Sequence, residues 1–304
     1  MLRPVNVMYF AENTMERWLA RVWPSREFRN DPLLGVCVEG RYAPIPIAGW
    51  KLIPWVAESL SQQRIFRPLT FSSFERLTVI IPVRDRDEHL RVLVPRLTEL
   101  LTEQSINHRL LVCEQESGGL FNKGVLFNAG LYYGADWTDY YCLHDVDAVP
   151  ITANYLCPSQ PLRLVTKLVD SSHGDTREPR YFGGAITVRR EQVFAANGFS
   201  NEYWGWGKED DDFFFRLLLV QCLCYADTQG TFYDLPNPPG QQIDTRNALK
   251  RRQLRLNRSR RSRLMRGLSC PQEDGINSLR YEIVNRTCSA GYERILVRRQ
   301  SAQS

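Results

Sequence analysis

The middle of the chain alternates between two hydrophobic patterns. Three short, β-branched apolar runs are typical of strands buried on both faces. Of the two segments between them, the first carries apolar residues at helical spacing and the second reads as a helix with a small-residue face. The predicted strands are 77–83, 109–115 and 140–147, and the predicted helices are 90–104, which Pro95 should bend, and 122–135. This order predicts βαβ units, a parallel sheet and the α/β class.

A polar segment follows each predicted strand. These segments read RDRDEH (84–89), EQESGG (114–119) and HDVD (144–147). Ligands of parallel α/β sheets bind beyond the carboxyl ends of the strands. We therefore expect the three segments to converge on one crevice.

The remaining pattern is looser. Residues 180–199 read as a Gly pair, a strand and a helix that ends at Asn197-Gly198. An apolar helix should follow at 213–223, and a Pro-rich turn at 231–240. We expect one domain in three parts: an N-terminal extension packing on the core (1–75), the core that carries the expected crevice (76–245), and a basic helix with a closing segment (246–304).

Composition is that of a globular chain with a sizeable core. The chain has 304 residues, 43% hydrophobic and 24% charged. No apolar run reaches the roughly 18 residues of a membrane-spanning helix. The N-terminus carries acids and arginines where a signal peptide needs an apolar run.

The net charge of +5 comes from one segment. Residues 250–266 hold nine Lys or Arg and no acid, and the rest of the chain has 30 basic against 34 acidic residues. We favour a solvated helical face with Leu249 and Leu256 on its buried side. Binding to nucleic acid or to an anionic membrane surface is the alternative, although no nucleic-acid-binding motif accompanies the run.

The cysteines do not define a site or a compartment. There are eight, and none forms a C-x-x-C pair, which argues against a zinc knuckle. Most are expected to be buried thiols. Cys142 and Cys157 bracket an acidic motif and could be bridged in an oxidising compartment.

That acidic motif is Asp145-Val146-Asp147. At the end of a strand, both carboxylates would share one face. Carboxylate oxygens suit Mg²⁺ or Mn²⁺, with pyrophosphate oxygens completing the coordination. The alternative is an ordinary loop or cap. His144 should point to the opposite face, so we interpret it as structural.

The stretch from 201 to 217 places two tryptophans among glycines before four consecutive acids. Crowded carboxylates raise the proton affinity of at least one of them, which helps a general base. Tryptophan offers a flat face for a sugar ring, and glycines let that face move. A metal-held diphosphate beside such a base suggests nucleotide-sugar chemistry.

These motifs resemble the β-1,4-galactosyltransferases, glycosyltransferase family 7, over residues 36–285. The resemblance implies the nucleotide-sugar transferase A-type (Rossmann-like) fold, a single domain with a mixed, mainly parallel sheet. It also implies Mn²⁺, with Mg²⁺ possible as the metal. The matching segments are GRYAP (40–44), IIPVRDRDEHL (80–90), FNKGVLFNAG (121–130), HDVDAVP (144–150), CPSQP (157–161), YFGGA (181–185), NGFSNEYWGWGKEDDDFFFRL (197–217) and DGINSLRY (274–281).

By resemblance, Asp147 would be a direct metal ligand. Lys123 replaces the usual arginine of the family, which removes a bidentate fork but keeps the charge. Tyr181 would face the C2 substituent of the donor and crowd an N-acetyl group, which favours galactose. The residues expected to bind the donor are Arg84, Arg86, Phe121, Lys123, Asp145, Val146, Tyr181, Gly184 and Trp206.

The acid run would serve the acceptor. Asp210 would be the general base, with Glu209 and Asp211 orienting the acceptor hydroxyls. Tyr203 and Trp206 would also contact the acceptor, with Trp206 on a moving cover that excludes water. Asp212 is the acid expected to be structural.

The family supplies a metal-ligand histidine where this chain has none. By register, Asp234 occupies that place, and we hypothesise that it ligates the metal. The alternative is an aspartate that caps a turn in the Pro-rich loop.

The predicted function is inverting transfer of galactose from UDP-galactose to a hydroxyl, expected to be O4, of an acceptor such as GlcNAc, glucose or xylose. Alternatives are an N-acetylgalactosaminyltransferase, a glycan polymerase subunit, or a catalytically impaired sugar-binding protein. We expect no nucleic-acid partner and allow peripheral membrane contact through 250–266. The predicted location is the cytoplasm of a bacterial-type cell, or the Golgi lumen if an anchor has been removed.

Overall fold

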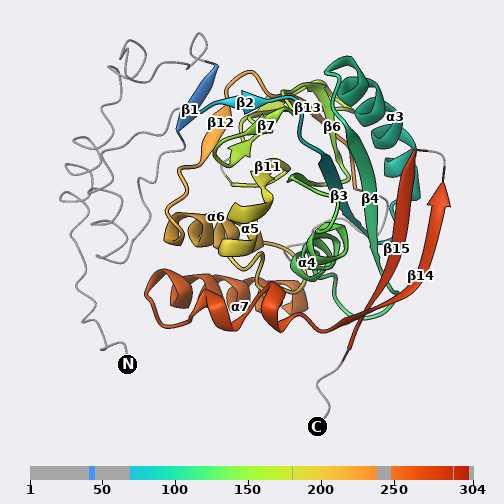
Figure 1. Cartoon of the computed structure of the whole chain (residues 1–304). Coiled ribbons are helices and arrows are strands. Elements are labelled where there is room, and N and C mark those ends of the chain that lie inside the picture. Colours follow the sequence, from blue (N-terminus) through green and yellow to red (C-terminus); the bar gives the residue numbers. More distant parts are fainter. Residues whose placement is uncertain (1–40, 45–68, 180, 238–247, 290, 301–304) are drawn as a thin grey trace.

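A nine-stranded mixed sheet forms the centre of the molecule (Figure 1). The computed structural model describes residues 41–44, 69–179, 181–237, 248–289 and 291–300. In spatial order the strands are β1 (Tyr42–Pro44), β12 (Tyr225–Asp227), β8 (Leu162–Arg163), β11 (Ala185–Arg189), β5 (Tyr140–His144), β3 (Leu77–Val83), β4 (His108–Gln115), β15 (Tyr292–Arg299) and β14 (Tyr281–Ser289).

The neighbours β5, β3 and β4 are parallel, as the βαβ pattern predicts, and β15, a strand that the sequence did not predict, is parallel to β4. Antiparallel pairs flank this parallel centre, at β5–β11 on one side and β15–β14 on the other. The predicted strands at 77–83 and 109–115 are therefore confirmed as β3 and β4. The mixed α/β architecture is confirmed as well, but the large sheet is not mainly parallel as predicted, because four of its eight described neighbouring strand pairs are antiparallel.

Two smaller sheets and five α-helices complete the described chain. The four-stranded sheet contains β10 (Thr176–Arg177), β9 (Lys167–Asp170), β13 (Thr231–Asp234) and β6 (Ala148–Thr152), and the two-stranded sheet contains β2 (Phe71–Ser72) and β7 (Cys157–Pro158). The helices are α3 (Asp87–Glu103), α4 (Lys123–Gly134), α5 (Arg190–Ala195), α6 (Glu209–Leu219) and α7 (Ala248–Met265), with short 3₁₀ turns η4 (Pro271–Glu273) and η5 (Ile276–Ser278).

Hydrophobic residues pack on both faces of the large sheet. One face contacts α4, α5, α6 and the end of α7, and the other contacts α3 (Figure 1). Strand β3 serves both faces, because Ile80 points to the first and Val79 and Ile81 point to the second. Helix α4 approaches closely, since a Cβ on Gly130 would lie 2.6 Å from Cγ2 of Ile80.

Several local predictions were wrong. The D-x-D motif lies in a turn between β5 and β6 rather than inside a strand. Residues 231–234 form strand β13, because they pair with β6 and β9, whereas a turn was predicted there. Leu249 and Leu256 are 74% and 43% exposed, so they are not the buried side of α7. That side consists of Asn257, Leu264 and Met265.

Other predictions fall partly outside the described residues. Most of the N-terminal extension lies there, so its packing on the core stays a prediction. Cys142 and Cys157 are both buried free thiols. Within the ranges that the structure describes, no helix has the combined length and apolar character of a membrane span.

Candidate active site

The polar segments after β3 and β5 line one cavity of about 1150 Å³, as predicted, whereas the segment 114–119 after β4 does not line it and the residues that follow it, Leu120, Phe121 and Lys123, do. Trp206, the first turn of α6 and the end of β13 complete its walls. Most of the predicted site residues line it. These are Arg84, Arg86, Phe121, Lys123, Asp145, Val146, Asp147, Tyr181, Trp206, Glu209, Asp210, Asp211 and Asp234.

Lys123 joins two predicted functional motifs across the cavity. Its Nζ lies 2.9 Å from a carboxylate oxygen of Asp210, 3.1 Å from Glu209 and 3.3 Å from Asp145. Lys123 is the first residue of helix α4, and Asn122 caps this helix by accepting a hydrogen bond from the amide of Val125. A fixed helix start therefore holds one ammonium group between the D-x-D motif and the acid run.

The charges of this cluster depend on one another. Burial alone would lower the pKa of Lys123, but Asp145, Asp210 and Glu209 raise it well above its ordinary value. Burial raises the pKa of Asp210, Lys123 opposes that rise, and Glu209 and Asp145 add to it. Asp210 thus has the raised proton affinity expected of a base, and a neighbouring cation that favours its ionised form.

Asp147 is the second carboxylate of the D-x-D turn and is partly buried. Burial, followed by repulsion from Asp145 and Asp234, raises its pKa to about 6. Its carbonyl oxygen accepts a hydrogen bond from the amide of Leu235 at 2.9 Å, which ties the turn to the end of β13. A divalent cation would stabilise an acid that two neighbouring acids destabilise.

Asp234 lies beside this turn because of strand pairing. Asp234 pairs with Ala148 of β6, which is the residue after Asp147, and with Asp170 of β9. Its carboxylate forms an ion pair with Arg177. In the described part of the chain, no three acidic, histidine or cysteine side chains are already grouped for a metal ion. The oxygen donors of Asp147 and Asp234 nevertheless fit a hard cation such as Mn²⁺, with further oxygens coming from a diphosphate.

Arg84 and Arg86 follow β3 and line the cavity. Arg84 packs over the ring of Phe121, 5.5 Å from its centroid, and donates to the carbonyl of Gly119. Arg86 donates to the side chain of Asn237 at 2.8 Å. Its Nη1 is buried and has no hydrogen-bond partner among the described residues. A buried guanidinium with a spare donor suits a phosphate oxygen.

The tryptophan loop is held from both sides. The amide of Gly205 donates to the carbonyl of Phe121 at 2.7 Å. On the other side, Nδ2 of the fully buried Asn257 contacts the carbonyls of Trp204 and Gly207 at 3.0 Å each and that of Trp206 at 3.4 Å. The Trp206 side chain is 59% exposed at the cavity. Asn257 thus links the loop to α7, a contact that the sequence did not reveal.

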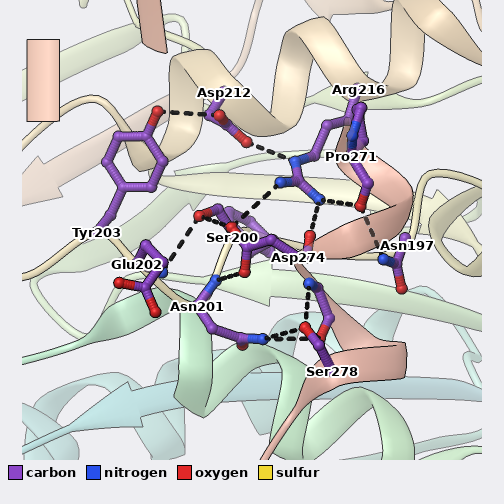
Figure 2. A network of polar contacts seen from close by, with 12 residues as sticks. Asn197, Ser200, Asn201, Glu202, Tyr203, Asp212, Arg216, Pro271, Asp274 and Ser278 are labelled. Carbon is purple, nitrogen blue, oxygen red and sulfur yellow. Dashed lines mark hydrogen bonds and ion pairs between the residues drawn. The ribbon is translucent and has the colours of Figure 1, made fainter. Parts of the chain in front are cut away.

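Asp212 and Tyr203 lie away from the cavity. Asp212 accepts hydrogen bonds from the hydroxyl of Tyr203 at 2.9 Å and from Nε of Arg216 at 2.5 Å (Figure 2). Arg216 also donates to the carbonyl of Asp274, and the Asp274 carboxylate binds Ser200. Asp212 therefore has the structural position expected of it. Tyr203 is 3% exposed and supports α6, so its predicted acceptor contact remains without geometric support.

The glycine pair after Tyr181 shapes the middle of the site. A Cβ on Gly183 would lie 2.3 Å from Oδ2 of Asp210, so only glycine leaves room for that carboxylate. The carbonyl of Gly184 accepts from the amide of Asp145 at 2.7 Å, and Gly184 itself adopts a left-handed φ of 85°. Gly184 thus positions the D-x-D turn from behind the cavity wall. The Gly-Gly motif was visible in the sequence, but neither contact could be predicted from it.

Helix α7 is the part of the site that the sequence did not predict. Arg261 pairs with Oδ2 of Asp211 at 2.9 Å, and Lys208 pairs with the same oxygen at 2.8 Å. Six further residues of α7 line the cavity. They are Lys250, Arg251, Gln253, Leu254, Arg258 and Met265.

Family models match most of the described core. The model for the N-terminal region of glycosyl transferase group 7 matches residues 51–158, and that for the N-terminal domain of galactosyltransferase matches residues 163–228. The chain belongs to glycosyltransferase family 7. The first match contains the D-x-D motif, and the second contains the tryptophan–acid motif.

Named relatives agree with this assignment. β-1,4-Galactosyltransferase 7 of Drosophila melanogaster is 39% identical over 151 residues, which are 48% of this chain and 46% of the relative. β-1,4-Galactosyltransferase 4 of Rattus norvegicus is 38% identical over 159 residues, 51% of this chain and 46% of the relative. The chain thus spans about half the length of the curated relatives it matches.

Solved structures confirm the predicted fold. The catalytic domain of Drosophila β-1,4-galactosyltransferase 7, in complex with xylobiose, has a TM-score of 0.62 and 28% identity. The match covers 75% of this chain and 95% of that chain. A variant of the same enzyme, in complex with manganese, UDP-Gal and xylobiose, matches equally well.

Proposed function

We propose that this protein transfers galactose from UDP-galactose to a sugar hydroxyl, O4 by expectation, with inversion and with Mn²⁺. The observation that carries the proposal is the Lys123 cluster, which joins Asp145 of the D-x-D motif to Asp210 inside one cavity. The family assignment supports it. So does the similar structure that was solved with manganese, UDP-Gal and xylobiose.

The donor fits the end of the cavity near β3. Arg84, Arg86 and Phe121 would hold the nucleotide and its diphosphate. Asp147 and Asp234 would hold the metal ion, which when bound neutralises charge on the departing diphosphate. Tyr181 lies on the cavity wall between Asp145 and Asp210 and would face the galactose ring.

The acceptor fits against the acid run. Asp210 takes the proton as the acceptor O–H bond breaks and the new bond to C1 of galactose forms. The bond between C1 and the phosphate oxygen breaks at the same time, and its electron pair leaves with UDP. Glu209 and Asp211 orient the acceptor hydroxyls. Trp206 covers the reacting groups and excludes water.

An array of donors and acceptors tests the proposal. UDP-galactose and UDP-GalNAc are each incubated with GlcNAc, glucose and xylose acceptors, with Mn²⁺ or with a chelator, and products are read by mass spectrometry. We expect galactosylated products only with UDP-galactose and free Mn²⁺. Binding of UDP-galactose without transfer or hydrolysis would contradict the proposal and favour a sugar-binding protein.

The cytoplasmic location stays a prediction, as does membrane contact through 250–266. Cell fractionation of the protein expressed in its source cells tests both. Recovery in a membrane or lumenal fraction would reject the first.

A further inference from the structure

Helix α7 presents a cationic stripe to the substrate cavity. Lys250, Leu254, Arg258, Arg261 and Met265 line the cavity at intervals of three or four residues, which places them on one side of the helix. The helix contains no acidic residue. Its charge is therefore directed into the site as well as toward solvent.

Two cations of this helix at the cavity are not paired with the acids of the site. The carboxylates of Glu209, Asp210 and Asp211 each already have a cationic partner. Arg251 and Arg258 line the cavity, and neither forms an ion pair with another described residue. Long exposed guanidinium groups at a cavity wall provide free donors for an incoming anion.

The stripe lies at the acceptor end. Asn257, which precedes Arg258, binds the loop that carries Trp206. Arg261, three residues further along, pairs with Asp211. Asp211 is assigned to the acceptor and Trp206 to both substrates, whereas the donor-binding arginines follow β3. Arg251 and Arg258 therefore belong to the helix that contacts the acceptor-orienting acid.

We propose that the acceptor sugar carries an anionic group, a carboxylate or a phosphate ester, which Arg258 and Arg251 bind. This inference rests on the proposed galactosyl transfer and names the class of its acceptor. A planar guanidinium binds either oxyanion through two parallel hydrogen bonds. The cationic wall would also raise the local concentration of such acceptors.

Matched acceptors test the inference. An aryl β-glucoside, the corresponding glucuronide and the corresponding glucoside 6-phosphate share the same O4 hydroxyl and differ only in charge at C6. We expect kcat/KM to be at least about tenfold higher for one of the anionic acceptors at low salt, and the advantage to shrink as salt is added. The preferred member distinguishes carboxylate from phosphate. Equal or lower rates for both anions would overturn the inference.

Variants locate the effect on α7. Arg258→Gln and Arg251→Gln should each lower the ratio of anionic to neutral kcat/KM by about tenfold. Arg252→Gln and Arg255→Gln are the controls, because these exposed arginines lie outside the cavity lining. An unchanged ratio together with a raised KM for UDP-galactose would overturn the inference and assign the arginines to the diphosphate. If wild-type protein neither hydrolyses UDP-galactose nor galactosylates any acceptor, the proposed function itself fails.

Discussion

Asp210 and Asp212 lie two residues apart in the first turn of α6, and both side chains are buried. Their surroundings differ. Asp210 lines the cavity and shares Lys123 with Asp145, a member of the motif expected to hold the donor. Asp212 is hydrogen-bonded to Tyr203 and Arg216 (Figure 2) and does not line this cavity.

Helix geometry explains the difference. Residues two apart on an α-helix point in directions about 200° apart, so neighbouring acids in one run meet different environments. The acid whose partners leave it open to the cavity can exchange a proton with a substrate. The enclosed acid has its hydrogen bonds satisfied by protein groups and serves to fix the helix. One run of acidic residues thus contains both the proposed general base and a residue that stabilises the helix.

The largest expected effect tests the proposed role of Asp210 as the general base. Asp210→Asn should lower kcat by about 10²- to 10⁴-fold, because the amide cannot take the acceptor proton. Steady-state kinetics with UDP-galactose and a saturating acceptor measure the change. The exposed Asp136→Asn is the control for loss of one carboxylate and should keep wild-type kcat. Near-normal turnover by Asp210→Asn would remove the assigned base.

Asp212→Asn tests the structural role of Asp212. Leaving Arg216 buried without its carboxylate should lower the free energy of unfolding by about 3–5 kcal/mol. Urea denaturation measures the loss, and activity is normalised to the folded fraction. Unchanged stability with a kcat as low as that of Asp210→Asn would contradict the division of roles.

Asp234 gives a third carboxylate to set against these two. Asp234→Ala should weaken Mn²⁺ binding by at least about 10- to 100-fold. Arg177→Gln is the informative partner variant, because it removes the ion pair but leaves the carboxylate free. It should keep or tighten Mn²⁺ binding, as measured by calorimetry. If both variants weakened binding equally, the ion pair rather than metal ligation would explain the role of Asp234.

The raised pKa of Asp147 predicts a pH dependence. Its pKa is about 6, so the carboxyl is protonated below that pH and must lose the proton to bind a metal ion. Mn²⁺ affinity should therefore be nearly constant above pH 7 and fall up to about tenfold per pH unit below pH 6. Calorimetric titrations from pH 5 to pH 8 would follow the change. A flat profile down to pH 5 would rule out this carboxylate as the competing group.

The smallest expected effect concerns donor choice. Tyr181→Leu should increase kcat/KM for UDP-GalNAc relative to UDP-galactose by about tenfold, because it enlarges the space near the sugar ring. Competition between the two donors, read by product mass, measures the ratio. An unchanged ratio would place the selectivity elsewhere.

Local pattern was sufficient for the centre of the fold. The strands β3 and β4 and the helix α4 follow directly from their apolar periodicity. The convergence of the D-x-D turn and Arg84 follows from parallel strand order. The acid run was identified as a candidate site because four consecutive carboxylates repel one another, which is unfavourable unless a ligand or a cationic partner compensates their charge.

Contacts between distant segments were not predictable in this way. Helix α7 buries Asn257 rather than Leu249 or Leu256, since the amide satisfies carbonyls of the tryptophan loop. Apolar periodicity cannot register a polar residue that is buried for its hydrogen bonds. The same limit concealed Gly183, whose role depends on Asp210 lying against it in space.

The most direct test of the account is a side-by-side measurement of turnover per folded molecule for Asp210→Asn and Asp212→Asn. Both are assayed with UDP-galactose, Mn²⁺ and one competent acceptor, under conditions where folding is verified by circular dichroism. The account predicts a loss of about a hundredfold or more for Asp210→Asn and turnover close to wild type for folded Asp212→Asn. Equal turnover by the two variants would contradict it.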